Sequence, residues 1–469
     1  MKFSVLLPTR NRLKYLKYAV DSVLAQDYEN WEIIISDNDS QEDIHSYIQS
    51  LNDPRIKYFR TKTFVSVTEN WNNSINHCTG DYVIMLGDDD ILLNKYFSTM
   101  IQLLQQYNYP NLIYANAYIY TYPGVIPQKP AGTLHSCINY PVFQDSKKPF
   151  WLTKELAMRL VQGHLNFNAH FGTNMQYILM KKSVIEKTKI DNQFFYSPYP
   201  DVYVMNVMML ETEKVLICPK EMVVIGVTPK STGNFLVNNN EKGGMDFLNT
   251  SKELTSLESL SSIILPSSPS LTSWLIAMET VKIHLKDKHN LKVNYFRYRY
   301  LQIESVVKGF FSQTRNKSKA DVIELFRLLS LGEKSAFFAP LFIMHFMKRF
   351  FPTSIKRLVG NLYDKLFNLS NIKSILFIKE KFSNIYELFE QEENGKLFSK
   401  EQIKAMLEAN LAGRSIEEIC KSNGISQAFL EKWKNQLQSS APSLDKRDDS
   451  LQNKVDALLN SIQNSSVKN

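Results

Sequence analysis

The chain has 469 residues, 44% of them hydrophobic, and a formal net charge of +8, which predicts two or three domains with a substantial core. Its four cysteines, Cys78, Cys137, Cys218 and Cys420, form no CxxC pair, so neither a disulfide scaffold nor a zinc site is indicated. The sequence contains no apolar run of the roughly 18 residues that span a membrane and no signal-peptide pattern, so we expect a cytoplasmic protein.

The first hundred residues alternate strand and helix patterns. Residues 3–9 and 31–37 are short apolar runs, and residues 12–26 between them place apolar side chains on one helical face. Residues 80–92, GDYVIMLGDDDIL, contain a third strand that runs into three consecutive aspartates. Strands that alternate with helices indicate βαβ units and an α/β fold with a largely parallel sheet.

Polar residues end each of these strands, at positions 9–11, 37–39 and 88–90. Ligands bind in the crevice beyond the carboxyl ends of such strands, so the three tips should converge. Adjacent carboxylates there suit a hard divalent cation, Mg²⁺ or Mn²⁺, together with substrate phosphates. The alternative is structural: the aspartates form a solvated turn, and Asp37 caps a helix.

The rest of the chain divides by composition. Strand-like pieces continue to about residue 235, and a helical pattern rich in aromatic residues and cations covers 250–390. Within it, residues 291–357 hold thirteen Lys/Arg and four Asp/Glu, which indicates an anionic partner such as a membrane surface or nucleic acid. A linker at 391–398, a compact helical module at 399–438 and a disordered tail at 439–469 are predicted after it.

The N-terminal motifs resemble those of a known family. Residues 5–43 and 67–92 look like family 2 glycosyltransferases with the GT-A fold. The PTRNR run, Pro8 to Arg12, is similar to the family's first nucleotide-binding loop, and residues 36–43 are similar to the second. The GDDD run, Gly87 to Asp90, looks like the acidic DXD-type metal motif.

The resemblance implies a fold and a reaction. The fold is a Rossmann-like, mixed, mostly parallel sheet with flanking helices over residues 1–240, followed by an all-α C-terminal region. The reaction is inverting transfer from a nucleotide-diphosphate sugar, with a UDP-sugar as the first expectation, to a hydroxyl of a saccharide or lipid-linked acceptor. Such transfer would serve the synthesis of a surface polysaccharide or glycoconjugate.

The resemblance also implies site residues. Those expected around the nucleotide are Pro8, Thr9, Arg10, Asn11, Arg12, Asp37 and Asp88. Asp88, Asp89 and Asp90 are expected around the metal, Mn²⁺ or Mg²⁺. Gly87 stands where the family often has its first aspartate, so the aspartate that touches the ion stays open.

Inverting transfer needs a general base beside the acceptor hydroxyl. Asp201 follows Pro200 and precedes an apolar helical run, where the family places such an acid, although helix capping alone would also favour aspartate there. Asp191 is the rival acid, in an ordinary turn context. Three residues have weaker expected roles: Asn174 and His170 on the acceptor side and Lys230 near the diphosphate.

Residues 335–368 are apolar, aromatic and basic. They are too short to span a bilayer but could lie in its interface, which would place a lipid-linked acceptor within reach at the inner face of the membrane. The equal alternative is a helical hairpin that packs on the catalytic domain. His345 in this segment is expected to be a core residue.

Residues 399–438 resemble the helix-turn-helix of transposase-type proteins. Their six cations and five acids leave a charge of +1, too little for strong phosphate binding, so DNA binding is not expected and an interaction or structural role is favoured. Two alternatives to a transferase remain at this stage: a DNA-associated regulator, and a transferase-like scaffold without activity.

Overall fold

The structure is a computed structural model, and it describes residues 1–126, 131–136, 140–231, 260–312, 317–350, 376–382, 384–393 and 396–440. Its centre is an eleven-stranded mixed sheet in which the order β11-β7-β6-β9-β4-β1-β2-β3 is continuous. Strand β10 pairs with β6 and also with the short strands β5 and β8. The predicted α/β architecture, a mixed sheet with flanking helices, is confirmed.

The strands are short and apolar in the interior of the sheet. Their bounds are β1 (Phe3–Thr9), β2 (Trp31–Asp37), β3 (Ile56–Arg60), β4 (Tyr82–Met85), β5 (Ile91–Leu92), β6 (Leu112–Thr121), β7 (Gly132–Ser136), β8 (Phe150–Trp151), β9 (Ile178–Lys181), β10 (Val215–Val227) and β11 (Leu376–Phe382). A separate two-stranded sheet pairs β12 (Glu392–Glu393) with β13 (Lys396–Leu397).

Helices connect these strands and continue beyond them. Those of the first half are α1 (Leu13–Leu24), α2 (Ile44–Leu51), α3 (Val67–Asn76), α4 (Tyr96–Gln106), η1 (Pro141–Phe143), α5 (Lys154–Leu165), η2 (Met175–Tyr177), α6 (Lys182–Thr188) and α7 (Pro200–Glu211). Those of the second half are α10 (Pro269–His284), α11 (Tyr295–Phe311), α12 (Lys319–Leu328), α13 (Leu331–Glu333), η5 (Lys334–Phe338), α14 (Ala339–Phe350), α16 (Tyr386–Gln391), α17 (Lys400–Leu411), α18 (Ile416–Asn423) and α19 (Gln427–Ser440).

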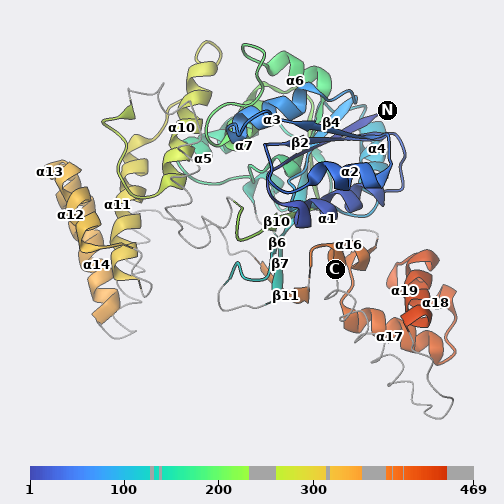
Figure 1. Cartoon of the computed structure of the whole chain (residues 1–469). Coiled ribbons are helices and arrows are strands. Elements are labelled where there is room, and N and C mark those ends of the chain that lie inside the picture. The colour runs from blue at the N-terminus through green and yellow to red at the C-terminus, as the bar shows by residue number, and fades with distance from the viewer. Residues whose placement is uncertain are drawn as a thin grey trace.

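The N-terminal βαβ units form the parallel part of the sheet. Strands β3, β2, β1 and β4 are parallel, and the register pairs Thr9 with Asp37 at the ends of β1 and β2. Helices α1 and α2 lie on one side of these strands and α3 lies on the other (Figure 1). Because both faces are covered, the strand interiors are almost continuously apolar. Their carboxyl ends therefore deliver polar residues to one edge, as predicted.

The described part of the C-terminal region is helical, as predicted, but it contains three strands, and its first helix belongs to the core of the N-terminal domain. Helix α10 packs on α7 and contributes Leu275, Ile276 and Met278 to the main hydrophobic core, so the predicted boundary near residue 240 does not separate two cores. Strand β11 then returns to the sheet as the partner of β7. The predicted linker at 391–398 contains the β12–β13 hairpin.

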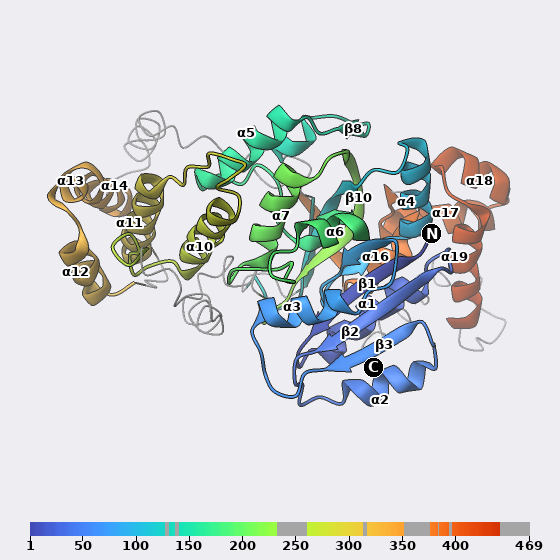
Figure 2. The same cartoon turned by 90° about the horizontal axis from the view of Figure 1, so that it is seen from above.

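The two remaining helical parts lie at opposite ends of the molecule (Figures 1 and 2). Helices α12 to α14 form one end with part of α11 and have their own apolar core. Helices α17 to α19 form the other end. Among the described residues, no helix combines the length and hydropathy that crossing a membrane requires.

The module of α17 to α19 follows its capping signals closely. Ser399 and Gln402 form a reciprocal capping box at the start of α17, and Ser415 caps α18. Gly424 ends α18 with φ 69°, a left-handed conformation that glycine adopts without steric cost. Trp433 is buried in the core of the module. The predicted tail at 439–469 lies almost wholly outside the described residues.

A buried carboxylate ties together the sheet edge opposite the polar strand tips. Glu32 on β2 accepts hydrogen bonds from Ser4 Oγ (2.6 Å) and Thr79 N (2.6 Å) and forms ion pairs with Lys2 (2.8 Å) and Lys57 (2.7 Å). Burial alone would raise its pKa, but these hydrogen bonds hold the pKa of Glu32 below its usual range. The folded state therefore stabilises the ionised carboxylate of Glu32.

We expect Glu32→Gln to lower the free energy of unfolding by about 2 kcal/mol at pH 7, since the buried donors keep only part of their partners and the lysines are partly solvated. Because the folded pKa is depressed, this contribution is fully present above the unfolded pKa, decreases as the pH falls below that value, and is lost as the pH falls through the folded pKa. Urea denaturation at pH 7 and at about pH 3, below the usual pKa of glutamate, would measure both effects. Glu29→Gln, at an exposed ion pair with Arg55, is the control and should change little; equal loss in both variants would contradict the assignment.

Candidate functional site

The tips of β1 and β4 are joined by direct contacts. Thr9 Oγ1 donates a hydrogen bond to Asp88 Oδ2 at 2.7 Å, and both residues are buried. The Arg12 guanidinium, at the start of α1, forms ion pairs with Asp88 (2.8 Å) and Asp89 (2.6 Å). The polar tips predicted from the sequence therefore converge at this edge.

A second segment closes the same cluster. Thr228, immediately after β10, donates to Asp89 Oδ2 at 3.3 Å and also accepts a hydrogen bond from Arg12. Burial raises the pKa of Asp88 to about 6, against the lowering effect of Arg12. The two carboxylates thus share one partly buried cation, the guanidinium of Arg12.

Asp90 differs from its two neighbours. Its Oδ1 accepts from Gly226 N at 2.7 Å, and its Oδ2 accepts from Gly87 N at 2.8 Å and from the Gln176 side chain. Both oxygens are therefore engaged by donors that hold the loop between β4 and β5. Asp90 braces this loop, whereas Asp88 and Asp89 are paired with Arg12.

The glycine that replaces the family's first aspartate has a steric explanation. A Cβ at Gly87 would lie 2.3 Å from Asp90 Oδ2, so any side chain there would displace the bracing carboxylate. Gly226 has the same constraint, because a Cβ would lie 1.9 Å from the Asp89 carbonyl oxygen. These two glycines let β10 and the aspartate loop approach closely.

The end of β2 lies next to the end of β1 in the sheet. Asp37 is fully buried, accepting from Tyr58 Oη at 2.6 Å and from Ser40 N at 3.0 Å. Asn11 lies beside it with φ 53°, receives Gln41 N on its Oδ1 at 2.6 Å, and so links the first and second loops. These contacts fix the two loops that were predicted to border a nucleoside.

Pro8 and Arg10, the two remaining residues that were predicted to border the nucleotide, flank Thr9 at the end of β1. Pro8 is partly buried on β1. Arg10 is exposed, and its guanidinium stacks 3.9 Å above the Phe64 ring. An exposed aromatic ring under a cation offers a surface on which a nucleobase can stack or a phosphate can pair.

Asp201 lies in the first turn of α7, directly after Pro200, as predicted. Burial raises the pKa of Asp201 to about 6, and a hydrogen bond from Val202 N at 2.8 Å opposes that rise only in part. A carboxylate with this pKa is an effective proton acceptor near neutral pH, because it is ionised yet still basic. The rival Asp191 is exposed and has φ 47° in a turn.

Helix α3 holds the loop that leads to Asp201. Asn72 Oδ1 accepts from the backbone N–H groups of Phe194 (2.9 Å) and Phe195 (3.0 Å), and Thr68 donates to the Ser197 carbonyl at 2.7 Å. Helix α3 also begins against the end of β2, because Val65 N donates to Asn38 Oδ1 at 2.9 Å. Asp201 is thus tied through α3 to the edge that carries Asp37.

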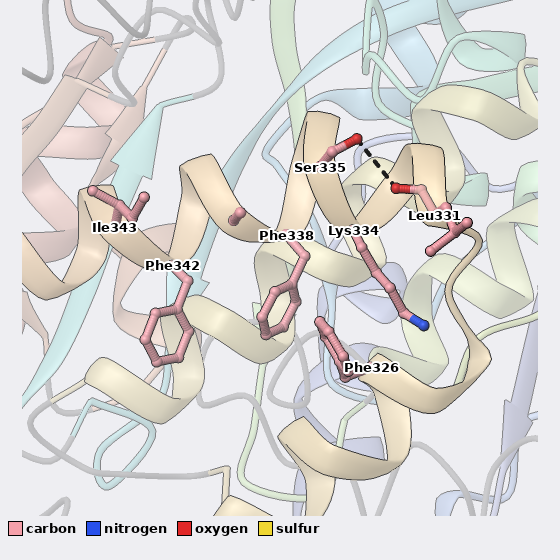
Figure 3. Close-up of a pocket in the computed structure, with 8 residues that line it drawn as sticks. Phe326, Leu331, Lys334, Ser335, Phe338, Phe342 and Ile343 are labelled. Carbon is pink, nitrogen blue, oxygen red and sulfur yellow. Dashed lines mark hydrogen bonds between the residues drawn. The ribbon is translucent and has the colours of Figure 1, made fainter.

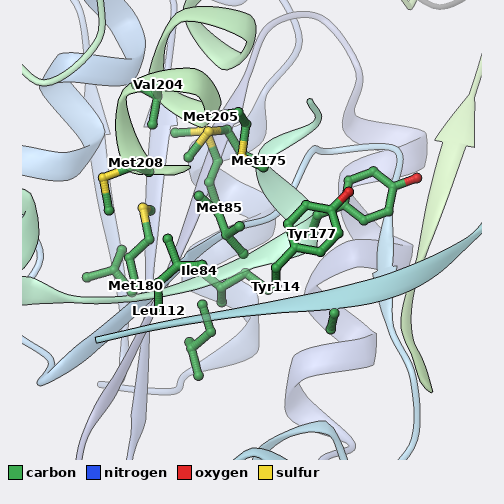
Figure 4. Close-up of a cluster of buried hydrophobic side chains, with 14 of the residues drawn as sticks. Ile84, Met85, Leu112, Tyr114, Met175, Tyr177, Met180, Val204, Met205 and Met208 are labelled. Atoms are coloured by element: carbon green, nitrogen blue, oxygen red, sulfur yellow. The ribbon is translucent and has the colours of Figure 1, made fainter. Parts of the chain in front are cut away.

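The underside of α7 is anchored on the sheet by a methionine-rich core. Met205 and Met208 of α7 point toward Met85 of β4, Met175 of η2 and Met180 of β9 (Figure 4). On its other side, Tyr203 Oη is 2.7 Å from His284 Nδ1 of α10. Packing on both sides leaves α7 little freedom to shift Asp201.

Three residues with weaker expected roles lie apart from the contacts described above. Asn174 is exposed at the start of η2, and Lys230 is exposed after β10. His170 is half-buried, and burial lowers its pKa. The segment that follows Lys230, from residue 232 to residue 259, lies outside the described residues.

Sequence reasoning missed four residues that complete the site. They are Thr228 and Gln176, which hold Asp89 and Asp90, and Thr68 and Asn72, which hold the loop before Asp201. Nothing in the spacing of the residues around Asn174 or Lys230 shows which side chain would reach the aspartates. No three His, Cys, Asp or Glu side chains of the described residues gather into a metal site by themselves.

The C-terminal segment reaches the back of the aspartate loop. Tyr122 Oη donates to the Asp89 carbonyl at 3.2 Å, and its ring belongs to a buried cluster that includes Phe389 of α16. Asn94 Nδ2 donates to the carbonyl groups of Phe389 (2.6 Å) and Glu392 (2.8 Å). Residues near the C-terminus thus support the functional edge from behind.

Comparison with known proteins agrees with both resemblances noted in the sequence. Residues 4–163 match the family model for glycosyl transferase family 2, and residues 394–462 match the model named transposase. Both resemblances are confirmed over these segments.

Two curated relatives are similar to the N-terminal segment. The GalNAc(5)-diNAcBac-PP-undecaprenol beta-1,3-glucosyltransferase of Campylobacter jejuni is 40% identical over 104 residues, which cover 22% of this chain and 34% of that protein. The UDP-Glc:alpha-D-GlcNAc-diphosphoundecaprenol beta-1,3-glucosyltransferase WfgD of Escherichia coli is 25% identical over 105 residues, 22% of this chain and 42% of that protein. The chain therefore spans less than half the length of either relative.

Among solved structures, S. aureus TarS residues 1–349 in complex with UDP-GlcNAc aligns with 78% of this chain and 92% of that chain. The sequence identity is 12% and the TM-score is 0.42.

Proposed function

We propose that this chain, which carries a glycosyl transferase family 2 segment at residues 4–163, is an inverting glycosyltransferase. It would move a sugar from a nucleoside-diphosphate sugar to a hydroxyl of a saccharide acceptor in glycoconjugate synthesis. Asp88 and Asp89 would face the diphosphate, the loops around Asn11 and Asp37 would border the nucleoside, and Asp201 would accept the proton of the attacking hydroxyl.

One observation carries this proposal: the ends of β1, β2 and β4 are tied to one another and, through α3, to a carboxylate with a raised pKa. Phosphate binding and proton abstraction need opposite environments, one cationic and one apolar. Arg12 provides the cationic environment, and the desolvated surroundings of Asp201 provide the apolar one. Asp201 would withdraw the proton as the oxygen attacks the anomeric carbon from the face opposite the diphosphate, so the configuration there would invert.

A divalent cation, Mn²⁺ or Mg²⁺, fits this edge with one adjustment. Such ions bind one or two carboxylates, with waters and substrate phosphates as the remaining ligands, which agrees with two available carboxylates and the absence of a self-contained metal cluster among the described residues. Asp88 and Asp89 would hold the ion, and Arg12, which now lies between them, would turn toward the phosphates. The ion would neutralise charge on the departing diphosphate.

The acceptor class follows from the relatives. Both curated names specify an acceptor on a diphosphoundecaprenol lipid, and one specifies UDP-glucose as donor. We therefore propose a saccharide on a polyprenyl diphosphate as the acceptor and a uridine diphosphate sugar as the donor. The C-terminal helix-turn-helix is assigned no DNA-binding role, because its charge of +1 would give weak phosphate binding.

The inactive-scaffold alternative loses its only support. Gly87 was the sole departure from the family pattern, and Asp90 occupies the space that a side chain at that position would need. The glycine is therefore compatible with an intact site.

A thermal-shift screen of nucleoside diphosphates and nucleotide sugars, each with and without Mn²⁺, tests the proposal. We expect one uridine nucleotide to raise the melting temperature by several degrees only when Mn²⁺ is present, since a ligand at about 100 times its Kd adds roughly 2.7 kcal/mol. The other nucleotides serve as matched controls. Absence of any nucleotide-dependent shift would exclude this function.

A further inference from the structure

Exposed apolar side chains concentrate on the helical end formed by α11 to α14. Twelve large hydrophobic residues of the described chain are exposed, and seven of them lie between residues 296 and 346. The largest exposed fractions are those of Leu331 (83%), Phe296 (69%) and Ile343 (58%). Scattered apolar residues are normal on a protein surface, but a cluster of this kind marks an interaction site.

Three of these exposed side chains, those of Phe326, Leu331 and Ile343, line an open apolar groove. Helix α12 contributes Phe326 to it, and the continuous helix made by α13, η5 and α14 contributes Leu331, Phe338, Phe342 and Ile343 (Figure 3). Aromatic rings follow one another along the groove. The centroids of Phe326 and Phe338 are 5.1 Å apart, and those of Phe338 and Phe342 are 5.7 Å apart.

Cations lie in the groove and elsewhere on its helices. Lys334, which lines the groove, has its Nζ 4.7 Å from the centroid of the Phe326 ring, and Lys319, Arg327 and Arg349 are exposed on the same helices. Of the acids there, Asp321 caps α12 with Ser318, Glu333 pairs with Arg299, and Glu324 is exposed. Residues 317–349 hold six Lys/Arg and three Asp/Glu, so this end of the molecule combines exposed apolar side chains with a net positive charge.

We propose that this surface, defined by Phe326, Leu331, Lys334, Phe338, Phe342, Ile343 and Phe346, docks on the headgroup region of an anionic lipid bilayer. Aromatic and aliphatic side chains would enter the acyl boundary, and the cations would meet lipid phosphates. A second copy of the chain is a poorer occupant, because a two-fold interface would place the same cations against each other. The proposal is independent of the catalytic assignment, although an acceptor on a lipid would explain its use.

Vesicle co-sedimentation of the full chain tests this surface. The vesicles are phosphatidylcholine alone, or phosphatidylcholine with roughly one third phosphatidylglycerol. The variant Leu331→Ser/Ile343→Ser/Phe346→Ser removes three exposed side chains, so its fold should persist, which circular dichroism would check. The control Tyr109→Ser/Ile283→Ser/Leu411→Ser removes three large exposed apolar side chains elsewhere on the surface.

We expect the unchanged chain and the control to bind the anionic vesicles, with weaker binding to neutral ones, and the first variant to bind roughly 100-fold more weakly. Lys319→Gln/Arg327→Gln/Lys334→Gln should remove the preference for anionic vesicles. Vesicle binding that is absent, or equal in both serine variants, would overturn the proposal, as would a dimer in sedimentation equilibrium that only the first variant dissociates. The nucleotide-dependent thermal shift should be the same in all variants, so failure of membrane docking and failure of the catalytic assignment are separate results.

Discussion

Replacing Asp201 by asparagine is expected to lower the rate of sugar transfer by about 10²- to 10⁴-fold, the usual contribution of a general base. Asparagine keeps the shape of the side chain and suits the first turn of a helix, but it cannot accept a proton. Binding of the nucleotide sugar should stay unchanged, since Asp201 belongs to α7 and the nucleotide loops belong to β1 and β2. Single-turnover transfer and donor binding by calorimetry measure the two effects separately.

The pH dependence gives a second readout. Burial raises the pKa of Asp201 to about 6. Below that pH, kcat/KM of the unchanged chain should therefore fall about tenfold per pH unit. This acid limb of the pH profile should be absent in Asp201→Asn. The same raised pKa means that the ionised carboxylate destabilises the fold above pH 6, so Asp201→Asn should raise the melting temperature at pH 8. Asp191→Asn is the matched control and should transfer normally. If it loses activity instead, the base is Asp191.

The sequence predicted those parts of the site that follow from strand ends. Thr9, Asp37 and Asp88 each close an apolar run, and parallel pairing then requires their tips to meet. Asp201 was found because its helix begins sharply after a proline. Such features are local, so a pattern of a few residues is enough to identify them.

The parts that were missed depend on contacts between distant segments. Thr228 meets Asp89 across 139 positions, and Gln176 meets Asp90 across 86. Strand β11 pairs with β7 although residue 376 is 240 positions from residue 136. The periodicity of a sequence does not show which distant strands pair. Likewise, the apolar residues of α10 form the same sequence pattern whether the helix packs on α7 or in a separate core. The division of the C-terminal half was therefore the least predictable feature.

The GDDD motif could be recognised from the sequence, but the sequence did not show how the roles of its three aspartates differ. Three adjacent aspartates are equivalent in the sequence, but the structure gives Asp90 three donors and leaves Asp88 and Asp89 to share Arg12. The difference arises because β10 supplies a backbone N–H to one aspartate only. Strand β10, more than a hundred residues away in the sequence, thus distinguishes Asp90 from Asp88 and Asp89 through the hydrogen bond from Gly226 N.

This distinction leads to the second large effect. Replacing Asp89 by asparagine is expected to remove Mn²⁺-dependent nucleotide binding and to lower transfer by about 10³-fold, because an ion at a diphosphate supplies several kcal/mol. Asp90→Asn is the contrasting variant: it should lower the melting temperature through the loss of its backbone hydrogen bonds, yet change the affinity for Mn²⁺ little. Paramagnetic resonance of free Mn²⁺ measures the affinity without any turnover.

Arg12 provides the decisive comparison, because its guanidinium occupies the gap between the two carboxylates that would hold the ion. If Arg12 competes with the cation, Arg12→Gln should bind Mn²⁺ more tightly than the unchanged chain in the absence of nucleotide, while binding the nucleotide diphosphate more weakly because a phosphate partner is lost. Opposite changes in the two affinities cannot come from a general loss of structure, which would weaken both. Normal Mn²⁺ binding by Asp89→Asn, or weaker Mn²⁺ binding by Arg12→Gln, would show that the aspartates serve Arg12 alone and that the diphosphate is held by the guanidinium without a metal ion.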